Sequence, residues 1–189
     1  GATNVLTQGS ASSAAGFALG GAIADGSNGG RVALAQSKGT LTLSGASTYS
    51  GGTVVNGGGT LRLGANDALP VGGAVTLGGT NGLGNGVGHL GLGDFSQTID
   101  SLTAVSVGAT YNTVTVAPGQ TLAVAGSAGI FVGVDAGVGS ETRVKMTGGG
   151  ALAVTHPAAN VTLGKGQSDE AGTGTGWLDL SELSSVTLG

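Results

Sequence analysis

Aspartates and two histidines are the side chains of this sequence that could support hydrolytic chemistry. Acid–base hydrolysis needs at least two such groups held together around one bond. The aspartates are instead spread along the chain, among them Asp94, Asp100, Asp135, Asp169 and Asp179. The tightest group is His89 with Asp94 and Asp100, in which we expect Asp94 to stand at a turn, and His156 precedes Pro157 in an expected solvated turn. No Ser-His-Asp or metal-ligand spacing is present, so we predict no enzyme activity and no cofactor.

Two glycine-rich segments are the candidates for a calcium site. The stretch 78–94 has the glycines of a calcium-binding β-roll but only one acidic residue, Asp94, and Asp169-Glu170 is a solitary acidic pair. A calcium ion needs six or more oxygen ligands, so both segments are predicted to be turns without metal.

Few aromatic residues are available to recognise a ligand. Phe95, Phe131 and Trp177 lie next to or within apolar triplets, which favours core stacking or an edge cap over a sugar-binding platform. Tyr49 lies in the segment ASTYSGG, where we expect it to pack in a turn.

Composition narrows the class of protein. Only 8% of the 189 residues are charged while 39% are hydrophobic, the reverse of a disordered chain. The 42 glycines follow no Gly-X-Y period, so they indicate frequent turns and exclude collagen. A net charge of −4 with six scattered Lys and Arg residues argues against nucleic acid as a partner. No apolar run of 18 residues is present, so we expect no direct membrane insertion by this segment, and the absence of cysteine is compatible with export through an oxidising compartment.

Short alternating triplets are the elements that must position all these side chains. Leu41-Thr42-Leu43 returns 20 residues later as Leu61-Arg62-Leu63, with Thr53-Val55 between them. Alternation places the two leucines of a triplet on one face of a strand and the central residue on the other. The predicted core comprises Leu41, Leu43, Leu61, Leu63, Leu77, Val114, Val116, Val154, Leu163, Leu178 and Leu180.

After residue 110 the triplets recur every 8 or 9 residues, three to a coil, with longer loops at 133–142 and 164–176. Recurrence of whole coils predicts an all-β fold, a right-handed parallel β-helix (β-solenoid). Asn-Gly pairs at 56–57, 81–82 and 85–86 leave an antiparallel sandwich as the alternative. We expect the last strand, 186–189, to pair with 161–164.

A resemblance supports the solenoid. The segment LTLSGASTYSGGTVVNGGGTLRLG (41–64) resembles the β-strand repeat in passenger domains of bacterial autotransporters, secreted proteins of Gram-negative outer membranes. GAIADGSNGGRVALAQSKGTLTLSG (21–45) resembles the usual lead-in to it, and LGLGDFSQTIDSL (90–102) its continuation. The segments from IFVG (130–133) to GTGWLDLS (174–181) are similar to a second glycine-threonine repeat of such proteins.

The resemblance implies a single β-helix over 1–189, a fragment of a longer passenger, with 1–21 as an irregular start or a cap. The implied function is non-catalytic display at the cell surface or outside the cell, as an adhesin or stalk that meets a host-surface or neighbouring-cell ligand. An extracellular filament built by self-association of solenoid ends is the alternative, and a carbohydrate-active enzyme is the least favoured.

Overall fold

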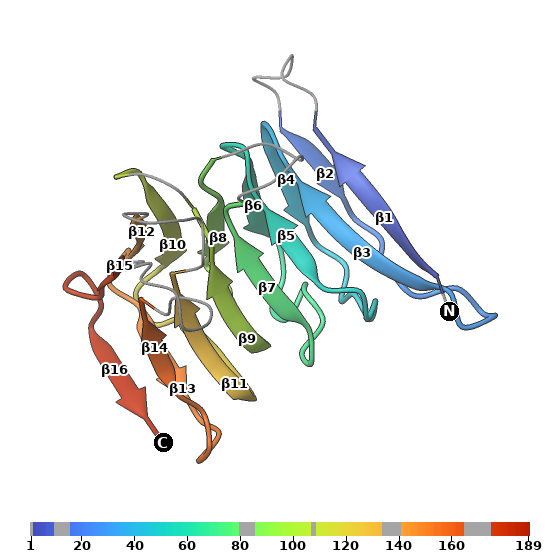
Figure 1. The fold of residues 1–189 in the computed structure, drawn as a ribbon. Helices are drawn as coiled ribbons and strands as arrows, with labels where there is room; N and C mark the ends of the chain where they lie inside the picture. Colours follow the sequence, from blue (N-terminus) through green and yellow to red (C-terminus); the bar gives the residue numbers. More distant parts are fainter. Residues whose placement is uncertain (1, 10–15, 80–85, 107–108, 134–140, 165–174) are drawn as a thin grey trace, which may run out of the picture.

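A computed structural model describes residues 2–9, 16–79, 86–106, 109–133, 141–164 and 175–189. Its strands form two sheets (Figure 1). The seven-stranded sheet contains β2 (Phe17–Leu19), β4 (Thr40–Leu43), β6 (Thr60–Leu63), β8 (His89–Gly93), β10 (Tyr111–Val116), β12 (Glu141–Thr147) and β15 (Thr175–Asp179). The nine-stranded sheet contains β1 (Thr3–Gln8), β3 (Arg31–Gln36), β5 (Thr53–Val55), β7 (Ala74–Leu77), β9 (Gln97–Ala104), β11 (Thr121–Val132), β13 (Ala151–Val154), β14 (Val161–Leu163) and β16 (Ser185–Leu188).

The chain winds as a parallel β-helix. Successive strands alternate between the two sheets as far as β13, and every strand pairs in parallel with the strand one coil away. Parallel pairing throughout the described strands excludes the antiparallel sandwich. The one antiparallel contact among the described residues is an isolated bridge between Gly79 and Gly86.

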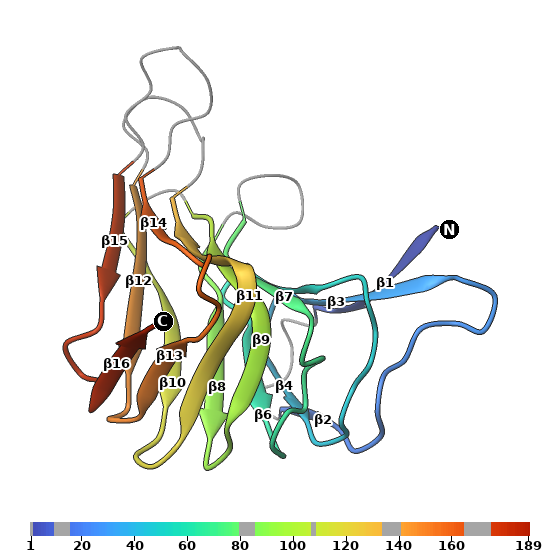
Figure 2. The same cartoon turned by 90° about the horizontal axis from the view of Figure 1, so that it is seen from below.

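The nine-stranded sheet is bent, which gives the coil a third side. The first part of β11 pairs with β13, while its last part, Ile130 to Val132, pairs with β14. The register with β9 shifts at the same place, between Val124 and Gly129, and Figure 2 shows both long strands curving around the core. In earlier coils turn segments occupy this third side, where the Thr48 N–H donates to Ile23 O over 2.8 Å.

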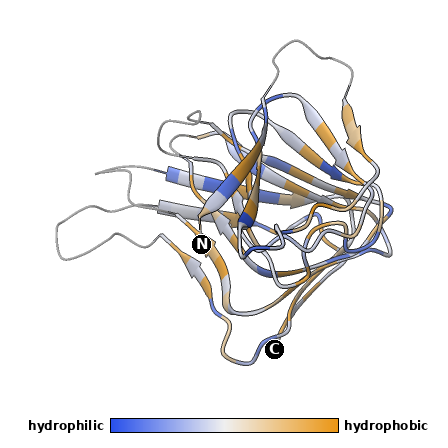
Figure 3. Cartoon of the chain, turned by 90° about the vertical axis from the view of Figure 1, so that its right-hand side faces the viewer, coloured by the Kyte–Doolittle hydropathy of each residue, from blue (hydrophilic) through white to orange (hydrophobic). Residues whose placement is uncertain are grey.

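Apolar side chains from alternate strand positions fill the space between the sides. Hydrophobic and hydrophilic residues alternate along the strands in Figure 3. Eight of the residues expected in the core are buried, namely Leu41, Leu43, Leu61, Leu63, Leu77, Val114, Val116 and Val154. Leu178 and Leu180 are half-buried and pack against that core.

Leu163 corrects the core prediction. Its register partner Val132 is fully buried, so Leu163 faces the same lumen, yet it is 47% exposed. The reason is its place in the stack: β14 pairs with β11 on one edge, and among the described residues no strand pairs with its other edge. Alternation predicts the direction of a side chain but not whether a further coil covers it.

The last strand of the described chain pairs differently from expectation. The last strand, β16, pairs with β13 through Leu152 and Val186, not with residues 161–164, because a coil must complete three sides before returning to the same face. At the other end β1 pairs with β3 and β2 pairs with β4, so residues 3–8 and 17–19 are coil strands. The described residues contain no helix of the length and apolarity needed to cross a membrane.

Candidate binding surface on the seven-stranded sheet

The outward side chains of the seven-stranded sheet stand in three columns that run along the helix axis. In-register parallel pairing stacks the same position of successive coils. The Gly91 column contains Thr42, Arg62, Gly91, Thr115 and Thr147. The His89 column contains Thr60, His89, Thr113, Lys145 and Asp179. The Tyr111 column contains Tyr111, Arg143 and Trp177.

The Tyr111 column is a stack of one cation between two aromatic rings. The guanidinium carbon of Arg143 lies 5.5 Å from the Tyr111 ring centre and 5.7 Å from the Trp177 ring centre, within range of cation–π attraction. Arg143 also pairs with Glu141 at 2.8 Å, and the hydrogen bond that it donates to this carboxylate raises the pKa of Arg143. Trp177 is 54% exposed on the end strand of the sheet, so the expectation that it stacks in the core is wrong.

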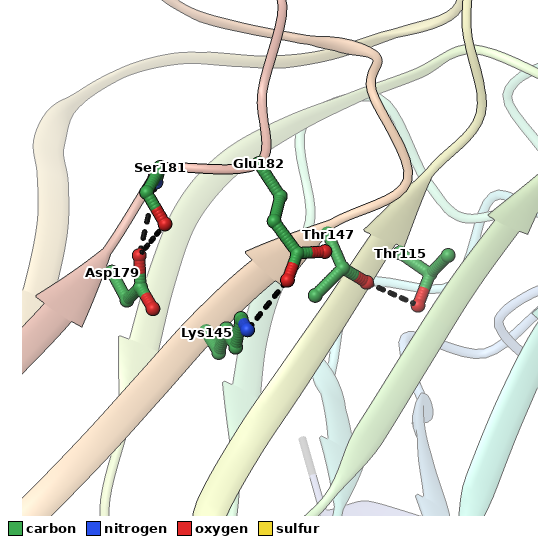
Figure 4. A network of polar contacts seen from close by, with 6 residues as sticks. All are labelled: Thr115, Lys145, Thr147, Asp179, Ser181 and Glu182. Carbon is green, nitrogen blue, oxygen red and sulfur yellow. Dashed lines mark hydrogen bonds and ion pairs between the residues drawn. The ribbon is translucent and has the colours of Figure 1, made fainter.

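Lys145 in the His89 column has a carboxylate partner. Its Nζ lies 2.5 Å from Glu182, and the hydrogen bond with this residue raises the pKa of Lys145 (Figure 4). The carboxylate of Asp179 accepts from the hydroxyl and the backbone N–H of Ser181, and these bonds lower the pKa of Asp179. Ion pairs on an exposed surface contribute little to the stability of the fold. They do, however, partly neutralise the positive charges of Lys145 and Arg143.

A groove of about 360 Å³ lies where the columns cross β6, β8 and β10. Its polar lining residues are Thr60, Arg62, His89, Thr113 and Thr115, and Gly91 and Gly93 also line it. Nδ1 of His89 lies 2.8 Å from the Thr113 hydroxyl, and burial lowers the pKa of His89, so its imidazole is neutral at pH 7. The Arg62 side chain is exposed, and within the described ranges no carboxylate pairs with it.

Within the described residues, the side chains that were considered for catalysis stay apart. His89 is on β8, Asp94 follows in an exposed turn and Asp100 lies on β9 in the other sheet. His156 lies in the turn after β13, where its Nδ1 accepts from the Ala158 N–H. Over the part of the chain that the structure covers, no three His, Cys, Asp or Glu side chains gather as a metal site. Asp135, Asp169, Glu170 and part of the glycine-rich stretch 78–94 lie outside the described residues.

Comparison with known families identifies one segment of the chain. Residues 36–63 match the model of the passenger-associated-transport-repeat. The chain carries this repeat. The match confirms the resemblance of residues 41–64 to the repeat of autotransporter passengers. No curated protein and no solved structure matches the chain.

The passenger-associated-transport-repeat covers one full coil and part of the next, from the end of β3 through β4 and β5 to the end of β6. Its tyrosine, Tyr49, is buried in the core, and its hydroxyl lies 2.6 Å from the Thr53 hydroxyl. Burial raises the pKa of Tyr49 to about 12. At the start of the repeat the buried Gln36 side-chain amide donates to Lys38 O and Gly39 O, which holds the turn into β4. The repeat therefore contains both the strands of a coil and the polar contacts of its corners.

Two buried amides outside the repeat were not predicted. The Gln97 side-chain amide accepts from the Leu69 N–H and donates to Leu69 O. It thereby satisfies both backbone groups of Leu69, which a neighbouring strand would otherwise bind. Asn112 accepts from the Gly88 N–H and donates to Ser106 and to Arg143 O, which joins three coils. The available signal was a polar residue at an inward position of the alternation.

Proposed function

We propose that this chain is a stretch of non-catalytic β-helix in an extracellular autotransporter-type passenger, exported to the surface of a Gram-negative cell as a stalk or adhesin. The observation that carries the proposal is that the matched repeat, 36–63, lies within a stack of coils that continues on both sides of it. Each coil needs only its neighbours for burial, so the fold can grow outside the cell and forms a stiff spacer.

The scattered titratable groups support the non-catalytic part of this proposal. Incubation of the purified chain with polygalacturonate should release no reducing ends, because the carboxylates of the described residues do not converge. Turnover lost on substitution Asp94→Asn would contradict it.

Export is tested by placing the chain between a signal peptide and an autotransporter translocator barrel in a Gram-negative host. The chain should become accessible to protease and antibody on intact cells. A matched fusion with Leu61→Ala, which empties part of the lumen, should reach the surface in a less protease-resistant form. Retention of both fusions in the periplasm would contradict the proposal.

The ends of the described stack favour a second candidate, a filament of stacked copies. At one end Leu6 and Phe17 are exposed beside an open apolar cavity of about 310 Å³, and at the other Leu163 and Leu188 are exposed. Unpaired parallel edges of this kind invite another strand. Light scattering at rising concentration should then show growth that Leu188→Lys abolishes, and a chain that stays monomeric would remove this candidate.

A further inference from the structure

We propose that the groove around Gly91 is a binding site for an oligosaccharide that carries carboxylate groups. Arg62 and the neutral His89 would recognise the ligand, and Gly91 would make the space for it. The site requires neither export nor display, so it can be tested on the purified chain. Three features point to this site: the missing side chain at Gly91, the charges around it and the polar side chains of the sheet face.

The gap is a missing side chain. Thr42, Arg62, Thr115 and Thr147 all project from the Gly91 column, and only Gly91 projects nothing. Because strands lie about 4.8 Å apart, Arg62 and Thr115 on either side of Gly91 stand roughly 10 Å apart. The resulting groove of about 360 Å³ is within the usual size range of small-ligand sites.

Glycine is not required here by the backbone. A Cβ atom at Gly91 would meet Arg62 Cγ at 3.7 Å and Leu61 O at 4.0 Å, which are ordinary contacts, and its φ is not in the left-handed region. Gly88, three residues earlier, differs, since a Cβ atom there would clash with a backbone carbonyl of the preceding coil. Gly91 borders a register shift between Thr115 and Val116, but neither sterics nor φ demands a glycine there. A strand interior normally favours a side chain, so this glycine points to a use for the space.

The charge of the groove favours an anion. Arg143 and Lys145 on the same face are paired with Glu141 and Glu182, whereas Arg62 has no such partner among the residues described. A guanidinium binds a carboxylate through two parallel hydrogen bonds. Arg62 is therefore the cation of this face best able to bind a ligand carboxylate.

The remaining polar atoms suit sugar hydroxyl groups. Nδ1 of His89 is engaged with the Thr113 hydroxyl, which leaves Nε2 as the ring nitrogen for a ligand. Thr60 and Thr115 add hydroxyls from the neighbouring coils. A peptide is less suited, because extended peptides bind by adding to a sheet edge and the backbone groups of this face are already used between strands. A linear polysaccharide needs only side chains and could continue along the columns.

The test is calorimetric titration of the purified chain with tetragalacturonate. The carboxylate form should bind, and the methyl-esterified tetramer should bind at least about tenfold more weakly because it carries no charge for Arg62. Binding should weaken with added salt. Absence of binding to tetragalacturonate and to a mannuronate tetramer would overturn the proposal, as would equal binding of a tetra-aspartate peptide.

Two pairs of variants separate the site from the fold. Gly91→Val fills the gap with a strand-favouring side chain and should abolish binding, whereas Thr42→Val puts the same side chain elsewhere in the column and should leave the Kd within twofold. Arg62→Gln should weaken binding at least about tenfold, whereas Lys38→Gln removes the same charge from an exposed turn and should not. Circular dichroism and melting establish that each variant is folded, and if Gly91→Val does not fold, Arg62→Gln decides. Unchanged binding in Arg62→Gln would overturn the proposal whether or not the chain is exported.

Discussion

Replacement of Leu61 by alanine tests the stacked lumen most directly. Leu61 is fully buried on β6, and its register partners Leu41 and Leu90 are buried on either side. Leu→Ala in a core costs about 2 to 5 kcal/mol, and the cost rises with the cavity that remains. Coils on both sides hold the neighbouring strands in place and prevent collapse into the space, so we expect about 3 to 5 kcal/mol.

Leu163→Ala is the matched control, since it deletes the same atoms from the same lumen where no described strand covers them. Burial of a whole leucine side chain is worth about 1.5 to 3 kcal/mol, so half-burial is worth about 1 kcal/mol. Its cavity would be open to water and would add little. The expected difference between Leu61→Ala and Leu163→Ala is therefore about 2 kcal/mol or more.

Equilibrium unfolding in urea, followed by far-UV circular dichroism and by Trp177 fluorescence, measures this difference. With an m value of about 3 kcal/mol/M, the midpoint of Leu61→Ala should fall by about 1 M and that of Leu163→Ala by about 0.3 M. Solenoid coils can also unfold in parts, so the two probes must give coincident transitions before these midpoints are read as free energies. Equal losses in the two variants would refute the reasoning that neighbouring coils set the cost.

Three other predictions concern glycine, a buried amide and a buried phenol. Gly88→Ala should destabilise by several kcal/mol, because its Cβ would lie 1.9 Å from a carbonyl oxygen, while Gly91→Ala should leave the urea midpoint unchanged or higher. Gln97→Leu should cost about 2 to 4 kcal/mol in the same titration, because both backbone groups of Leu69 lose their partner; a loss under 0.5 kcal/mol would contradict this. The pKa of about 12 for Tyr49 lies above the unfolded value of 10, so its stabilising contribution is full below pH 10 and falls by about 2 to 3 kcal/mol as pH rises to 12. Melting of Tyr49→Phe across this range should lack that part of the decline.

Period-2 alternation was sufficient to predict the parallel β-helix and eight buried positions, because the two apolar residues of each triplet define the face that points inward. It was not sufficient for Leu163, whose exposure depends on a neighbouring strand and not on its own triplet. Trp177 was misplaced for a related reason, since it sits beside Leu178 in an apolar triplet but on the outward side. The buried Gln97 and Asn112 were missed because a polar residue at an inward position breaks the hydropathy pattern. The pattern also contains no information about the hydrogen-bond partners that allow such an amide to be buried.

The surface columns were beyond sequence reasoning because the length of a coil is not constant. Leu41 pairs with Leu61, 20 positions on, whereas Val144 pairs with Leu178, 34 positions on. The strands keep their register in spite of this difference, as the near-independence of coils allows. The residues that meet on the outer face are therefore separated by unequal intervals, and the gap at Gly91 exists only once Arg62 and Thr115 are in register beside it. In a solenoid of this kind, local alternation determines which residues fill the lumen. Which residues meet on the surface depends on the register between coils. A ligand site on the sheet face is therefore recognised from its columns and not from neighbouring residues in the sequence.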